Sequence, residues 1–151
     1  MSFSQADMDA ILSDTTKLVT GNIEWTEDED HSPSKEFTVA VDSESGYPLV
    51  IRGSFNPEAK ALSYVLIHAR SRRIYALDMG KDHHNPTRQN VGEKHKHRWT
   101  DKFRDKEAYV PDDITCTIDD PVALWAQFCQ EAQIVHAGTM LSPIDPQTRM
   151  F

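Results

Sequence analysis

Four runs of β-forming residues follow one another at intervals of about a dozen residues. They are residues 36–41, 49–55, 62–68 and 73–78. Gly46 and Pro48 stand in the first gap, and Asn56-Pro57 stands in the second. Glycine, proline and asparagine favour tight turns, and short strands joined by tight turns are typical of antiparallel pairing. The pattern predicts an antiparallel meander.

A helix is expected on either side of this meander. Residues 4–20 begin with Ser4, a good N-cap, and carry apolar residues at helical spacing until Gly21. Residues 120–134 begin with an aspartate followed by Pro121, which is favoured in the first helical turn. The order predicts an α+β fold, with an antiparallel sheet of about five to six strands and both helices packed on one face.

The chain is expected to form a single domain, residues 1–151. Its sheet would span residues 22–118, with a polar, histidine-rich insertion at 80–94, and residues 136–151 would form an irregular tail. The sequence contains no apolar run of membrane-spanning length, so no membrane association is expected. Cys116 and Cys129 lack the spacing of a metal pair and are expected to be free thiols, which fits a reducing cytoplasm.

Charge is distributed unevenly along the chain. The formal net charge is -8, which argues against a general nucleic-acid coat protein. Residues 70–106, however, hold eleven Lys and Arg against five Asp and Glu. A basic segment in an acidic chain can attract an anion locally, or it can pair with the acidic remainder.

Residues 78–99 concentrate the side chains that carry chemistry. Four of the chain's seven histidines lie there: His83, His84, His95 and His97. Alternation on a strand places His95, His97 and Trp99 on one face and Lys96 and Arg98 on the other. The segment therefore predicts a loop with one histidine pair and a return strand with the other.

One interpretation of this segment is a metal site. His95 and His97, two residues apart on a strand, can bind one divalent ion, and His83 can supply a third ligand. Asp78 or Asp82 can add a carboxylate or orient an imidazole. Zinc, manganese and nickel are the candidate ions, although the helical His-Glu-x-x-His motif is missing.

A second interpretation is metal-free cleavage of RNA, and a third is binding without catalysis. Histidines on either side of a phosphate can act as general base and general acid, with the neighbouring 2′-hydroxyl as nucleophile. Arg88 and Lys94 are preferred for stabilising charge, with Lys96 and Arg98 as second choices. These four residues and Trp99 can equally bind an acidic partner or a nucleotide. A further interpretation is that the segment is a solvated polar loop without a function of its own.

Several short motifs resemble a family of small bacterial and phage proteins. The motifs are Leu77-Asp78-Met79-Gly80, His83-His84-Asn85-Pro86, Val91-Gly92, His95-Lys96-His97, Ala108-Tyr109 and a final helix ending near Phe128-Cys129. Their arrangement, H-x-N-P followed by H-x-H, is also similar to the core of TumE-type toxins of toxin–antitoxin modules. The resemblance implies a small cytoplasmic protein from mobile or prophage DNA that is involved in conflict between phage and host.

The sequence leads to one main hypothesis and one alternative. The main hypothesis is a toxin-like protein, a ribonuclease-like phosphodiesterase if it is an enzyme, that acts on RNA through His83, His84, His95 and His97. The alternative is a non-enzymatic binder, such as a phage-borne inhibitor of anti-defence or anti-CRISPR type that docks on a host protein. Expected partners are an antitoxin or host protein, RNA and a second copy of the chain, to which the C-terminal Met150-Phe151 would contribute.

Overall fold

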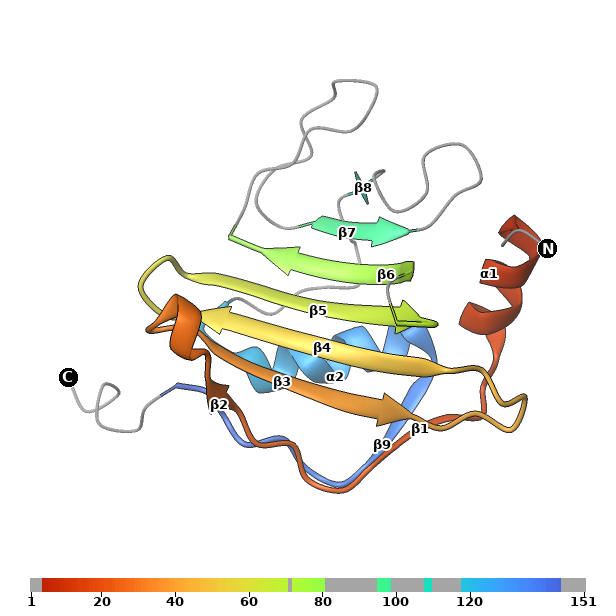
Figure 1. The fold of residues 1–151 in the computed structure, drawn as a ribbon, viewed down its shortest axis with the longest axis horizontal. Helices are drawn as coiled ribbons and strands as arrows, with labels where there is room; N and C mark the ends of the chain where they lie inside the picture. The colour runs from red at the N-terminus through yellow and green to blue at the C-terminus, as the bar shows by residue number, and fades with distance from the viewer. Residues whose placement is uncertain (1–3, 71, 81–94, 99–107, 110–117, 145–151) are drawn as a thin grey trace.

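The centre of the molecule is an antiparallel sheet whose strands follow chain order (Figure 1). The computed structural model describes residues 4–70, 72–80, 95–98, 108–109 and 118–144. The seven strands are β2 (Thr26–Glu27), β3 (Lys35–Val41), β4 (Leu49–Asn56), β5 (Ala61–His68), β6 (Arg72–Met79), β7 (His95–Arg98) and β8 (Ala108–Tyr109). The four predicted runs are β3 to β6, so the meander is confirmed.

Two helices complete the α+β fold that the sequence predicted. Helix α1 spans Gln5–Ser13, and Ser4 and Asp7 form a capping box at its start. Helix α2 spans Pro121–Ala132, with Asp120 as its N-cap. It lies behind the sheet in Figure 1, and both helices contribute to one apolar core. None of the helices in the described part of the chain is long and apolar enough to cross a membrane.

The core between α2 and the sheet is rich in aromatic side chains. Tyr64 of β5 lies between Phe37 and Phe128, at ring-centroid distances of 6.0 and 5.8 Å. Its hydroxyl donates a hydrogen bond of 2.7 Å to the carbonyl oxygen of Pro121, which satisfies this buried polar group. Trp125 of α2 packs edge-on against Tyr64 at 5.4 Å. These contacts fix the helix against the face of the sheet that alternate strand residues make apolar.

A parallel pair of strands corrects both predicted helix boundaries. The first helix was predicted over residues 4–20, but α1 ends at Ser13 and β1 spans Lys17–Thr20. The second was predicted over 120–134, with an irregular tail from 136, but β9 spans Ile134–Ala137 and pairs with β1. Helical spacing of apolar residues cannot reveal a partner strand more than a hundred residues away. The rest of the tail, 145–151, lies outside the described residues, and so does Cys116.

Lys17 in β1 is completely buried, which is rare for a lysine. Its Nζ donates hydrogen bonds to the carbonyl oxygens of Ile11, Leu12 and Asp14, at the C-terminal end of α1. The last carbonyls of a helix lack the usual partner four residues on, although the Ile11 oxygen also accepts a hydrogen bond from the Asp14 N–H. A cation at this end also complements the helix dipole. Burial lowers the pKa of Lys17 to about 8.

The lowered pKa makes stability depend on pH in a defined direction. Between pH 8 and 10.5 the unfolded chain keeps the Lys17 proton while the folded chain loses it. We therefore expect the free energy of unfolding of the wild type to rise over this range relative to that of Lys17→Met. Urea unfolding at pH 7, 9 and 10.5 measures this difference, and a difference that stays constant would contradict the assignment.

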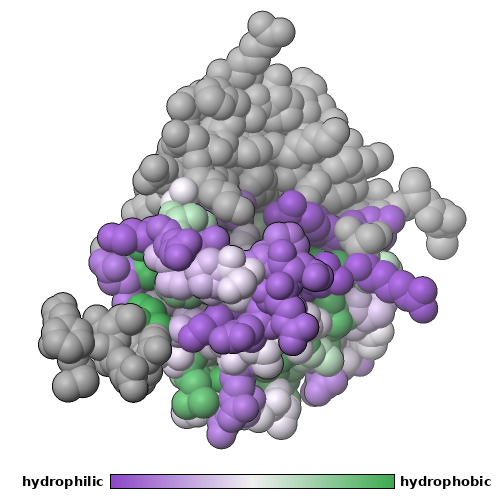
Figure 2. Space-filling model, turned by 60° about the vertical axis from the view of Figure 1, so that its left-hand side comes forward, coloured by the Kyte–Doolittle hydropathy of each residue, from purple (hydrophilic) through white to green (hydrophobic). Residues whose placement is uncertain are grey.

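The second face of the sheet carries no helix from the described residues. It holds polar and charged side chains together with a small buried apolar cluster of Val65, Ile67 and Ala76. On β4, Leu49, Ile51 and Phe55 are buried in the core, while Arg52 and Ser54 between them are exposed. This surface is called the open face below. The side of the molecule where the β4–β5 turn lies is also mainly hydrophilic (Figure 2).

Candidate functional site

Strand register aligns polar residues in a row across the open face. In an antiparallel sheet, directly paired residues lie on the same face. Pairing connects Thr26 of β2 to Glu36 of β3, Glu36 to Ser54 of β4, and Ser54 to Ser63 of β5. It continues from Ser63 to Asp78 of β6, and from Asp78 to position 95 of β7. The polar row therefore runs across six strands, β2 to β7, as is common on the solvent-facing side of an antiparallel sheet.

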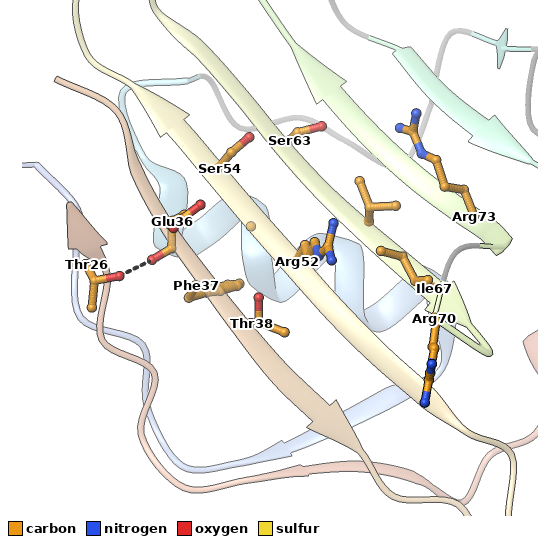
Figure 3. A pocket seen from close by; sticks show the side chains of 12 residues that line it. Thr26, Glu36, Phe37, Thr38, Arg52, Ser54, Ser63, Ile67, Arg70 and Arg73 are labelled. Carbon is orange, nitrogen blue, oxygen red and sulfur yellow. Dashed lines mark hydrogen bonds between the residues drawn. The ribbon is translucent and has the colours of Figure 1, made fainter. Parts of the chain in front are cut away.

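The open face is hollowed and carries three arginines (Figure 3). The hollow has a volume of about 770 Å³. Figure 3 shows Arg52 on β4, Arg73 on β6 and Arg70 at the turn between β5 and β6. Ala69 and Arg70 both have positive φ, at 52° and 77°, so the hairpin turn that carries Arg70 is unusual for residues with a Cβ.

The positive charge of this face is only partly neutralised. Within the described residues, Arg52 and Arg70 have no ion-pair partner. Glu36 lines the same hollow and is exposed. The arginines therefore favour an anionic ligand.

Asp78 is held in place by a neighbouring strand. The Ser63 hydroxyl donates a hydrogen bond to Asp78 Oδ1, and both residues are half-buried. A carboxylate that accepts such a bond has a defined orientation. Asp78 therefore holds an oriented carboxyl group beside Ser63, which lines the hollow.

The structure confirms the predicted strand at residues 95–98, and the role of its histidines stays a prediction. His95, Lys96, His97 and Arg98 form β7, as the alternating pattern predicted. Their register partners in β6 are Asp78, Leu77, Ala76 and Tyr75, respectively. Leu77 and Tyr75 belong to the main core. Ala76 belongs to a second buried cluster, with Val65 and Ile67, on the other face of the sheet, and Asp78 belongs to neither cluster. Positions 95 and 97 therefore share the open face, and positions 96 and 98 share the core face.

The remaining candidates, His83, His84, Arg88, Lys94 and Trp99, lie outside the described residues. Whether His83 or His84 approaches His95 and His97 therefore stays a prediction. Among the side chains that the structure describes, no group of three His, Cys, Asp or Glu is arranged to hold a metal ion. The side chains of His95 and His97 are not in that set.

The arginines of the hollow were not predicted from the sequence. The alternation of Val50-Ile51-Arg52-Gly53-Ser54 was a usable signal, because it places Arg52 and Ser54 on the polar face. Arg73 could not be assigned in this way. A register shift between Leu66 and Ile67 interrupts the β5–β6 ladder, so simple alternation fails there.

Comparison with known proteins identifies the family of the chain. Neither the curated proteins nor the solved structures contain a match to it. A family model described as a family of unknown function, DUF6978, matches residues 3–134. This match covers both helices, all strands of the antiparallel sheet and the open face. The chain therefore belongs to the DUF6978 family.

Proposed function

We propose that this protein binds RNA on the open face of its sheet and acts on the phosphodiester backbone through His95 and His97. The observation that carries the proposal is the arginine-lined hollow on a chain of net charge -8. An acidic chain repels polyanions in general, so a local group of arginines indicates a specific anionic ligand. Backbone pairing puts positions 95 and 97 on the same face of the sheet, and the proposal assigns the chemical step to these two histidines.

The hollow favours contacts to phosphates over contacts to bases. Guanidinium groups bind phosphate oxygens through paired hydrogen bonds. Among the described residues that line the hollow, Phe37 is the one aromatic, and its ring is buried at 6% exposure. The described lining residues therefore include no exposed aromatic ring on which a base could stack. Binding should depend strongly on salt and weakly on sequence.

The proposal includes the setting that the sequence resemblance implied. A small cytoplasmic protein that cleaves RNA would act as a toxin, and an antitoxin or host protein would restrain it. His83 and His84 are part of this proposal as additional groups at the site, with Arg88, Lys94 and Trp99 as further RNA contacts. The neighbouring 2′-hydroxyl of RNA provides an internal nucleophile, which makes RNA the favoured substrate over DNA.

Replacing the arginines tests RNA binding directly. We expect Arg52→Gln and Arg70→Gln each to weaken binding of a labelled single-stranded RNA by roughly tenfold, because each removes a charge-assisted contact to phosphate. The slope of log affinity against log salt should fall by about 0.7 for each arginine removed. Fluorescence anisotropy at several salt concentrations measures both quantities.

The matched control is Lys60→Gln, which removes a positive charge from the β4–β5 turn outside the hollow. Equal losses of RNA affinity in all three variants would mean that only net charge matters and would contradict a specific binding surface.

The proposed cleavage of RNA is tested by incubating RNA with the variants His95→Ala and His97→Ala. If both variants cleave RNA as the wild type does, the histidines have no role in the reaction.

The acidic remainder of the chain favours one alternative function. Outside residues 70–106 the chain has five Lys and Arg against nineteen Asp and Glu. Such a surface can mimic nucleic acid toward a basic host protein, as expected of a phage-borne inhibitor. A stable stoichiometric complex with a host protein, without RNA binding or turnover, would support this function in place of the first.

A further inference from the structure

Two neighbouring strands bring one carboxylate and two histidine positions together on the open face. The β6–β7 ladder pairs Asp78 with His95 and Ala76 with His97. Residues paired across a ladder share a face, and so do residues two apart on one strand. Positions 78, 95 and 97 therefore lie on one face of the sheet. Position 95 is directly opposite position 78, and position 97 is two residues further along β7.

From this juxtaposition we infer that Asp78, His95 and His97 form a binding site for a divalent transition-metal ion. Directly opposed residues of an antiparallel pair have Cβ atoms about 4.5–5.5 Å apart, a separation that one bound ion can bridge. Two imidazoles and one carboxylate are ligands of zinc and of related divalent ions, and three protein ligands leave a position open for water or substrate.

The hydrogen bond at Asp78 supports a ligand role for this carboxylate. Ser63 donates to Oδ1, which orients the Asp78 carboxyl group on the open face. Metal-binding carboxylates are commonly oriented by a hydrogen bond from an outer group. Ser63 also lines the arginine hollow, so it connects the inferred metal site to that surface.

The two residues that pair with His97 in the neighbouring strands are both small. The partners of His97 are Ala76 in β6 and Ala108 in β8. Alanine is the smallest residue with a Cβ, so the ladder places no bulky residue at either position beside His97. The sequence suggested His83 as the third ligand, with Asp78 or Asp82 as a possible carboxylate, and the register favours Asp78.

A metal ion at this position would border the hollow. The ion could neutralise charge on a phosphate that the arginines hold. In that case His95 and His97 would act as metal ligands and not as a free general acid and base. Only the catalytic role of the ion rests on the proposed function. Metal binding itself can be measured without RNA, so the two proposals fail separately.

Titration of the full chain with Zn²⁺, and in parallel with Mn²⁺ and Ni²⁺, tests the site. Isothermal titration calorimetry of the wild type should show one ion per chain for at least one of the three metals. Asp78→Asn, His95→Ala and His97→Ala should each weaken binding of that metal by at least about tenfold. Ser63→Ala should weaken it by about tenfold as well, because the carboxylate loses its orienting bond.

His31→Ala is the control, because His31 ends the short 3-10 helix Glu29–His31 and its side chain is 75% exposed. Circular dichroism of every variant checks that the fold is retained. Wild-type protein that binds none of the three metals would overturn the inference. So would an Asp78→Asn variant with wild-type affinity, or a His31→Ala variant that loses as much affinity as His95→Ala.

Discussion

Replacing Phe128 by alanine is expected to lower the free energy of unfolding by about 3–5 kcal/mol. Phe128 is fully buried, and its ring packs against Tyr64 and Tyr75 at centroid distances of 5.8 and 5.5 Å. It also stacks on Trp125 at 6.0 Å. Alanine would leave a cavity among large, rigid rings that cannot collapse to fill it. A domain of this size has a total stability of about 5–15 kcal/mol, so the loss is large.

Urea unfolding followed by tryptophan fluorescence measures this effect as a shift of the midpoint. Val135→Ala is the matched control, because it also removes apolar carbon but Val135 is 58% exposed. We expect the control to change stability by less than about 0.5 kcal/mol. Similar losses in the two variants would mean that α2 is not anchored to the sheet through Phe128.

The second large effect is expected at Gly80, which follows β6. Its φ is +84°, and a Cβ there would collide with the carbonyl oxygen of Lys60 in the β4–β5 turn. Gly80→Ala therefore combines the cost of a left-handed residue, about 1–2 kcal/mol, with a clash against backbone. Because backbone cannot move aside as a side chain can, we expect a further loss of about 1–3 kcal/mol.

Gly46→Ala separates these two contributions. Gly46 has a similar φ of +75°, but the space that an alanine methyl group would occupy there has no other atom within 4 Å. Its replacement should cost only the conformational part, about 1–2 kcal/mol. The urea midpoints of the two variants give the difference. Equal midpoints would show that the contact between the end of β6 and the β4–β5 turn is not close in solution.

Under the proposed function, the two faces of the sheet have different roles, one in stability and the other in ligand binding. Alternate residues of β4, β5 and β6 fill the aromatic core, and the residues between them form the open face. Replacement of Phe128 or Gly80 should therefore lower the free energy of unfolding. Changes at Arg52 and Arg70, which are exposed, should act on ligand binding and leave stability within about 0.5 kcal/mol.

Local patterns predicted most of the architecture correctly. Turn residues between β-rich runs predicted β3 to β6, and the sequence Asp120-Pro121 predicted the start of α2. The prediction failed at residues 17–20 and 134–137, which form β1 and β9. Periodicity within a window cannot detect this pairing, because each strand is stabilised by the other and not by its own sequence.

The sequence by itself determined the α+β class, the meander and the alternating strand that carries His95 and His97. It did so because local propensity and the two-residue period of a strand are properties of neighbouring residues. Only the tertiary structure decided that His95 stands opposite Asp78 and that Arg52, Arg70 and Arg73 line one hollow. Register depends on how turns and a bulge align separate strands, so it becomes visible only when the strands are paired.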